Sequence, residues 1–237
     1  MPDQRQSSMT LKGLNAWYGE SHVLHGIDID LNEGEVVSLL GRNGAGKTTT
    51  LRSIMGMVDK RQGSIAIHGR ETIGLPSRQI ARMGVGYVPE ERGIYASLSV
   101  RENLALPPRV SHAGYADEEL FELFPNLRER LSSAGNRLSG GEQQMLALAR
   151  VLRTGSKLLL LDELTEGLAP VIVQQIAATV RKLRDRRYTA LLVESNFRFA
   201  RSVADRHLIV EQGRIVDVFT NEQLDRNLEK LNNYLGV

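Results

Sequence analysis

The chain has 237 residues, of which 41% are hydrophobic and 24% charged, a composition typical of one large globular domain or a domain with two lobes. Its 30 Lys and Arg against 28 Asp and Glu give a net charge of +2, too small to indicate a nucleic-acid-binding surface. It has no cysteine, which excludes disulfide bonds and thiol catalysis and suits a reducing compartment.

The N-terminal residues and the apolar runs give no sign of export or of a membrane span. The first eight residues are polar and contain no apolar signal core. The longest purely aliphatic run, Leu158–Leu161, is far too short to cross a bilayer. We therefore expect the chain to stay in the cytosol and to reach a membrane only through a partner.

Apolar periodicity predicts an α/β core interrupted by a helical segment. In chain order, we expect strands over residues 9–16, 23–31, 35–40, 64–68, 84–88, 158–161, 189–194, 208–211 and 215–218. Helices are predicted to start near Gly46 and to cover 171–186 and 224–235. Between about residues 91 and 153 only helical patterns occur. The prediction is a core of about residues 1–90 and 154–237, with an antiparallel β part at its start and a helical subdomain inserted at about 91–153.

A glycine-rich loop follows the strand predicted over residues 35–40. Gly41–Thr48 fits the phosphate-binding pattern G-x-x-x-x-G-K-[ST]. Glycines let backbone N–H groups line an anion-sized concavity, and the next helix directs its N-terminal N–H groups at the same phosphates. Lys47 is placed to reach the β- and γ-phosphates, and the Thr48 hydroxyl to bind Mg²⁺. The candidate nucleotide-binding residues here are Gly41, Arg42, Asn43, Gly44, Ala45, Gly46, Lys47, Thr48 and Thr49.

Two adjacent carboxylates end the apolar run Leu158–Leu161. Burying unpaired charge is costly, so Asp162 and Glu163 should have a use there. Asp162 is placed to hold Mg²⁺, and Glu163 to orient and deprotonate the attacking water. The alternative, a strand end that simply emerges into solvent, is disfavoured by the glycine loop in the same chain.

A second glycine motif, Leu138–Gln144, precedes another predicted helix. Ser139 and Glu142 have the spacing of a helix capping box, which explains those two residues. It does not explain Gly140 and Gly141, which weaken a first helical turn unless the backbone must lie close to something. A helix N-terminus of this kind can bind phosphate. One chain does not need two sites for one γ-phosphate, so this one would serve the ATP of a second subunit.

These motifs, in this order, resemble the ATP-binding cassette (ABC) family over essentially the whole chain. The resemblance implies a P-loop NTPase fold of the ABC type, with ATP and Mg²⁺ as cofactors. It also implies a dimer, with ATP clamped between Gly41–Thr48 of one subunit and Ser139–Glu142 of the other. It assigns Tyr18 to adenine stacking, although a core aromatic is the alternative, and it places Glu90 where the family usually has a glutamine that contacts Mg²⁺.

Three further stretches look like the ATP-binding subunits of branched-chain amino-acid importers, and urea or short-amide importers are similar. They are Val88–Glu90, Glu166–Pro170 and Leu192–Ala200. The implied protein is an ATP-hydrolysing motor at the cytoplasmic face of the inner membrane. Its partners would be a second ABC ATPase subunit (in a homo- or heterodimer), transmembrane permease subunits and, indirectly, an external substrate-binding protein, with no nucleic acid.

The chain departs from the family pattern at Glu90, at Leu164, where a proline is usual, and at Ser195, where a histidine normally contacts the γ-phosphate. Serine donates one hydrogen bond but cannot carry a positive charge or reach as far. We therefore include Ser195 among the catalytic candidates with Lys47 and Glu163, and expect this site to hydrolyse ATP slowly beside a faster partner site.

Two other functions remain open. The first is an ATP-gated, non-hydrolytic interaction module in a heterodimer, favoured by Ser195 and disfavoured by the intact Asp162–Glu163 pair. The second is a soluble ABC ATPase acting on ribosomes or nucleic acid, disfavoured by the single cassette and the small net charge.

Overall fold

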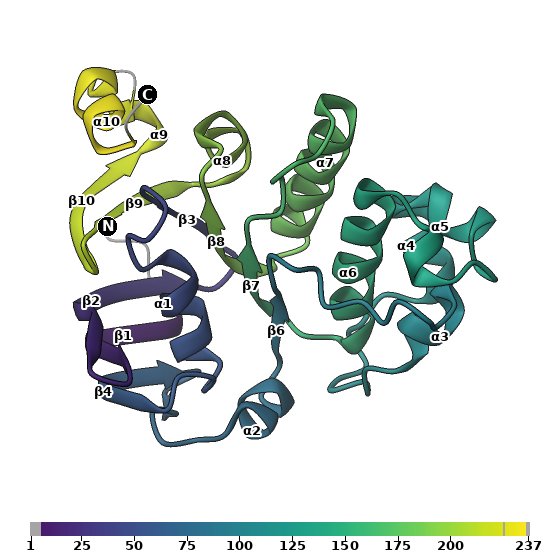
Figure 1. The fold of residues 1–237 in the computed structure, drawn as a ribbon, viewed down its shortest axis with the longest axis horizontal. Coiled ribbons are helices and arrows are strands. Elements are labelled where there is room, and N and C mark those ends of the chain that lie inside the picture. The colour runs from purple at the N-terminus through teal and green to yellow at the C-terminus, as the bar shows by residue number, and fades with distance from the viewer. Residues whose placement is uncertain (1–5, 225, 236–237) are drawn as a thin grey trace.

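A six-stranded sheet forms the centre of the molecule (Figure 1). The computed structural model describes residues 6–224 and 226–235. In spatial order the strands are β10 (Arg214–Thr220), β9 (Arg206–Glu211), β3 (Val36–Leu40), β8 (Thr189–Glu194), β7 (Leu158–Asp162) and β6 (Val85–Val88). All neighbours are parallel except β10, which is antiparallel to β9. The carboxyl ends of β3, β7 and β8 therefore lie side by side at one edge, where ligands bind in open α/β sheets.

Both faces of this sheet are buried because successive side chains of a strand point in opposite directions. In β7, Leu158 and Leu160 pack with the first helix and the antiparallel sheet, whereas Leu159 and Leu161 pack with the helices that follow β6 and β7. This is why the sequence reads as an unbroken apolar run that ends in acids.

A second, antiparallel sheet covers one of these faces. Its strand order is β2 (Ser21–Asn32), β1 (Ser7–Tyr18), β4 (Lys60–Ile67) and β5 (Arg70–Glu71). In Figure 1 it lies beside helix α1 (Lys47–Ile54), which buries Leu51 and Ile54 against it. The hairpin of β1 and β2 ends near the start of α1, so Tyr18 is carried to the rim of the site.

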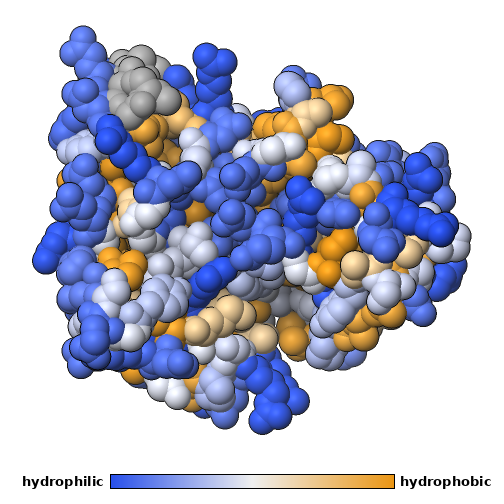
Figure 2. Space-filling model, viewed as in Figure 1, coloured by the Kyte–Doolittle hydropathy of each residue, from blue (hydrophilic) through white to orange (hydrophobic). Residues whose placement is uncertain are grey.

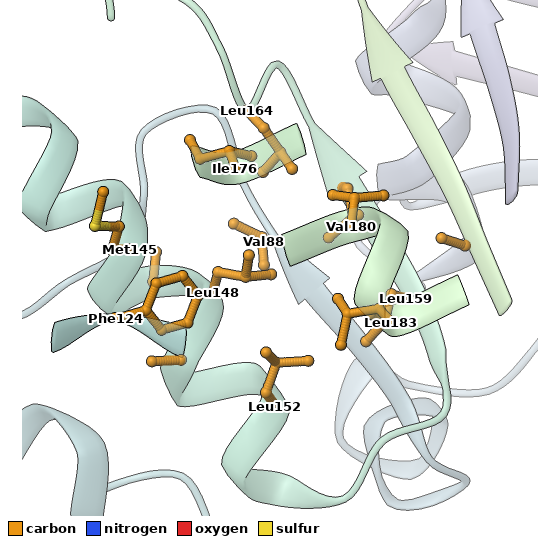
Figure 3. Close-up of a cluster of buried hydrophobic side chains, with 14 of the residues drawn as sticks. Val88, Phe124, Met145, Leu148, Leu152, Leu159, Leu164, Ile176, Val180 and Leu183 are labelled. Carbon is orange, nitrogen blue, oxygen red and sulfur yellow. The ribbon is translucent and has the colours of Figure 1, made fainter. Parts of the chain in front are cut away.

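The segment between β6 and β7 is helical, as expected. It contains α3 (Val100–Ala105), α4 (Asp117–Leu123), α5 (Pro125–Glu129), the 3₁₀ turn η1 (Gly135–Arg137) and α6 (Gly140–Thr154). Figure 3 shows how it is attached to the core: Phe124, Met145 and Leu148 pack towards Leu159 of β7 and Ile176 of helix α7 (Pro170–Asp185). Leu164, where the family usually has proline, is 1% exposed and belongs to the same cluster.

The structure confirms the predicted α/β class with its antiparallel part, and it adds elements that periodicity did not reveal. They are β5, α2 (Ser77–Arg82) and α8 (Phe197–Val203). The helix predicted over residues 224–235 is instead two short ones, α9 (Asn221–Leu224) and α10 (Leu228–Leu235), and residue 225 between them lies outside the described residues.

The face drawn in Figure 2 is mostly hydrophilic, and its apolar residues lie in separate patches, one of them over α7. Val171, in the first turn of α7, is 68% exposed. Within residues 6–224 and 226–235, no helix has the length and apolarity needed to cross a membrane.

Candidate active site

The glycine loop joins the end of β3 to the start of α1 and is shaped by close backbone contacts. A Cβ atom on Gly41 would lie 2.3 Å from the Val210 carbonyl oxygen, and one on Gly46 would lie 2.8 Å from Leu24 Cδ2. Gly46 also has φ +108°, a left-handed conformation that favours glycine. The loop therefore wraps the N-terminus of α1, whose first N–H groups have no partner within the helix and can bind an anion.

Lys47, Glu163 and Ser195 meet at the centre of the site, although they come from three separate segments. Lys47 Nζ donates to the Gly41 carbonyl oxygen at 2.8 Å and to Ser195 Oγ at 3.2 Å. It also pairs with Glu163 Oε1 at 3.3 Å, and the two side chains are only 6% and 10% exposed. Ser195 donates to Glu163 from Oγ at 2.6 Å and from its backbone N–H at 2.9 Å. The structure thus brings together the three residues that the sequence offered as catalytic candidates.

Asp162 is the last residue of β7 and directly precedes Glu163. Thr48 Oγ1 donates to Asp162 Oδ1 at 3.0 Å, and the Tyr87 hydroxyl donates to Asp162 Oδ2 at 3.1 Å. Burial raises the pKa of Asp162, and these two hydrogen bonds oppose that rise. Burial and the Asp162 carboxylate together raise the pKa of Tyr87, which keeps its hydroxyl a donor. Tyr87 was not among the candidates, although it lies three residues before Glu90.

Glu90 lies on the rim, opposite a second carboxyl group. Loss of hydration raises its pKa, and repulsion from Glu166 raises it further. No group of three or more His, Asp or Glu side chains in the described part of the chain could hold a metal ion. A cation at Asp162 and Glu90 would therefore also need the Thr48 hydroxyl and oxygens from water or phosphate.

A pocket of about 490 Å³ connects these groups. Of the candidates, it is lined by Tyr18, Asn43, Gly44, Gly46, Lys47, Thr48, Thr49, Glu90, Glu163 and Ser195. Gly41, Arg42, Ala45 and Asp162 do not line it but lie beneath or beside it. The exposed Arg42 side chain instead donates to the Asn233 carbonyl oxygen at 3.3 Å.

The pocket also has lining residues that were not among the predicted site residues, although the resemblance placed Thr165 and Glu166 in a loop, residues 165–169, that crosses the dimer interface. They are Val23, Thr165, Glu166, Glu194 and Asn196. Glu194 is fully buried at the end of β8, and its carboxyl group accepts hydrogen bonds from Thr165. The acidic end of the strand predicted over residues 189–194, one residue before Ser195, was the signal that could have found it.

The Ser139–Glu142 motif lies at the start of α6 and does not line this pocket. Ser139 and Glu142 form the expected capping box: Ser139 Oγ accepts from Glu142 N at 3.3 Å, and Ser139 N donates to Glu142 at 2.7 Å. Gly141 has a packing reason that the sequence did not reveal, because a Cβ there would lie 3.0 Å from two carbon atoms of Ile172 in α7. Gly140 faces only the flexible guanidinium of Arg92, at 3.3 Å.

Gly141→Ala is expected to destabilise the fold by about 1–3 kcal/mol, because Ile172 is branched at Cβ and the extra methyl group overpacks α6 against α7. Gly140→Ala is the matched control and should cost less, since Arg92 can move away. Urea unfolding measures both. Equal losses for the two variants would contradict the packing explanation, as would a Gly141→Ala penalty that Ile172→Ala fails to reduce in the double variant.

Comparisons with known proteins agree with this geometry. The family described as ABC transporter matches residues 24–166. The high-affinity branched-chain amino acid transport ATP-binding protein BraG of Pseudomonas aeruginosa is 42% identical over 94% of this chain and 97% of its own length. The lipopolysaccharide export system ATP-binding protein LptB of Haemophilus influenzae is 35% identical over 97% of this chain and 98% of its own.

Solved structures give the same fold. An ATP-binding subunit of an ABC transporter has a TM-score of 0.80 at 26% identity, covering 97% of this chain and 99% of that one. A nucleotide-free ATP-binding cassette from an ABC transporter has a TM-score of 0.83 at 19% identity, covering 98% and 99%. The chain therefore belongs to the ABC transporter family and is an ATP-hydrolysing ABC subunit.

Proposed function

We propose that this chain is the ATPase subunit of a membrane importer and that branched-chain amino acids are its first candidate cargo. The observation that carries this proposal is the 42% identity to BraG over nearly the full length of both chains. LptB relatives reach 34–35% over a similar span, so lipopolysaccharide export is the second candidate.

In the pocket, Lys47 would bind the β- and γ-phosphates together with the N–H groups of the glycine loop, and Tyr18, 45% exposed at the rim, would stack on adenine. Thr48, Asp162 and Glu90 would hold Mg²⁺, and their oxygen atoms are the ligands that this ion prefers. Bound there, Mg²⁺ would neutralise phosphate charge. The contact between Thr48 and Asp162 and the crowding of Glu90 with Glu166 both support a cation at this point.

Glu163 would accept the proton of the attacking water, because its carboxylate pairs with Lys47 and borders the pocket. Its carboxylate is held by Lys47 and Ser195. Phosphates that draw Lys47 towards themselves would weaken this pairing, so binding of ATP would itself free the base.

Ser139, Gly140, Gly141 and Glu142 would serve the nucleotide of a second ABC ATPase subunit, since they lie outside this chain's own pocket. Residues 91–153 would form the arm that meets transmembrane permease subunits, with Tyr95 and Leu106 exposed by 52% and 50% on it. The chain would thus work at the cytoplasmic face of the membrane and depend only indirectly on an external binding protein.

The test is purification of the tagged chain from detergent-solubilised membranes, followed by reconstitution of the complex in vesicles. We expect permease subunits to co-purify, and ATP-dependent uptake of labelled leucine, isoleucine or valine that stops with Glu163→Gln. Co-purified export permeases, with no uptake, would favour lipopolysaccharide export. A membrane-free complex that contains RNA would exclude both transport functions.

Ser195→His is expected to raise kcat for ATP hydrolysis several-fold, about the effect of one charge-assisted contact to phosphate, because histidine can reach further and carry a positive charge. Ser195→Ala is the control: it removes the Oγ contacts to Lys47 and Glu163 and should lower kcat. Steady-state phosphate release measures both. Brisk wild-type turnover that neither substitution changes would contradict the idea that Ser195 makes this site slow.

A further inference from the structure

The ends of β7 and β8 exchange hydrogen bonds in both directions. Glu163, just after β7, accepts two hydrogen bonds from Ser195, just after β8. Glu194, the last residue of β8, accepts two in return from Thr165, from N–H at 3.2 Å and from Oγ1 at 2.9 Å. Between them, Glu163 N donates to the Val193 carbonyl oxygen at 2.9 Å. The end of β8 therefore holds the segment that follows β7, and Glu163 after β7 holds the segment that follows β8.

Glu194 has no part in the proposed chemistry. It is nevertheless an ionisable residue that is 0% exposed, which needs an explanation. A buried carboxyl group costs free energy unless donors satisfy it. Here the donors are Thr165 and the backbone N–H of Asn196. All three contacts belong to loops that border the pocket.

The backbone of Glu163 shows why such an anchor matters. Its φ is +45°, a left-handed conformation that a residue with a side chain keeps only where its surroundings hold it. Val193 holds the peptide on the N-terminal side of Glu163, and Glu194 holds Thr165 two residues later.

We propose that Glu194 is a positioning residue for ATP hydrolysis, which fixes Thr165 and thereby holds Glu163 in its strained conformation next to Lys47. This inference rests on the proposed role of Glu163 as the base. It assigns to Glu194 no contact with nucleotide or with the reacting atoms.

The ionisation of Glu194 gives this role a distinct signature. Burial raises the pKa of Glu194 to about 8, and the charge of Glu163 contributes to the rise. The charged groups that face it are Glu163 after β7 and, beyond that, Lys47 of α1. Below that pH the carboxyl group is neutral, and the Thr165 hydroxyl can accept its proton as readily as donate one. Above it, a second negative charge beside Glu163 opposes the binding of an anionic triphosphate.

The experiment measures kcat and KM for ATP across pH with the full chain. We expect Thr165→Val to lower kcat about tenfold to a hundredfold by letting Glu163 shift, with KM within about twofold of wild type, and Thr165→Ser to restore it. The matched control is Thr179→Val, which removes an equally buried hydroxyl that donates to Gln175 within α7, and it should keep wild-type activity.

The pH profile separates this role from a merely structural one. For the wild type, kcat/KM should fall above pH about 8, because this ratio reports groups of the free enzyme. Glu194→Gln, which stays neutral, should lack that fall, and adding Thr165→Val to it should lower kcat no further than Thr165→Val alone.

Wild-type kcat in Thr165→Val, or an unchanged fall in Glu194→Gln, would overturn the inference. Should Thr165→Val not fold, the profile of Glu194→Gln decides alone. An inactive Glu163→Gln beside a fully active Thr165→Val would leave the proposed base in place and refute only the role of Glu194, whereas an active Glu163→Gln would refute the base itself.

Discussion

Glu163→Gln is expected to lower kcat for ATP hydrolysis by about 10²–10⁴-fold, the usual contribution of a general base, while ATP still binds. The amide cannot accept the proton of the attacking water. It can, however, keep an acceptor oxygen for the Ser195 N–H, which the carboxylate now engages at 2.9 Å. The fold should therefore survive, and phosphate release measured at saturating ATP isolates the chemical step.

A second readout follows from the two-subunit arrangement. If ATP is clamped between two chains and cannot be hydrolysed, an ATP-dependent dimer of Glu163→Gln should accumulate and be visible by size-exclusion chromatography. Glu211→Gln is the matched control, because Glu211 ends strand β9 of the same sheet but is exposed and does not line the pocket. Wild-type turnover in Glu163→Gln, or an equal loss in Glu211→Gln, would contradict the role of Glu163.

Local patterns explain why so much of this site could be predicted from the sequence. A buried parallel strand is apolar on both faces, so Leu158–Leu161 stands out, and the two acids that follow mark the sheet edge. The phosphate loop likewise needs its glycines, its lysine and its hydroxyl within eight consecutive residues, Gly41–Thr48. Each of these two signals is contained in its own short stretch of sequence.

The contacts that complete the site are not local. Glu194 and Thr165 are 29 residues apart, and Tyr87 reaches Asp162 across 75, so neither pairing leaves a pattern in one window. The packing of Gly141 against Ile172 could not be predicted either, because Ile172 lies in another helix. The break between α9 and α10 was not predicted either. Leu224 and Leu231 belong to the same apolar cluster as Leu40 of β3, and one continuous helix would give the same apolar pattern.

Lys47→Ala is expected to weaken ATP binding by about 10- to 100-fold, which corresponds to the roughly 1.5–3 kcal/mol of a hydrogen bond to a charged group. Hydrolysis should fall with it. The side chain is 6% exposed, and solvent cannot readily replace its ammonium group. Lys47→Arg should also weaken ATP binding. The Lys47 ammonium group donates to the Gly41 carbonyl oxygen at 2.8 Å, and a planar guanidinium differs from it in shape and hydrogen-bond geometry. Titration with a fluorescent ATP analogue measures the affinity.

Lys47→Ala also removes the ion-pair partner of Glu163. Comparing it with Glu163→Gln tests how this ion pair affects ATP binding. Glu163 Oε1 pairs with Lys47 at 3.3 Å, so the phosphates of ATP would compete with Glu163 for Lys47. Glu163→Gln removes that competition and should tighten ATP binding, whereas Lys47→Ala should weaken it even when combined with Glu163→Gln. The exposed Lys12→Ala is the control and should bind ATP normally. Weaker binding by Glu163→Gln would mean that the pair with Lys47 prepares the lysine for phosphate and does not restrain it.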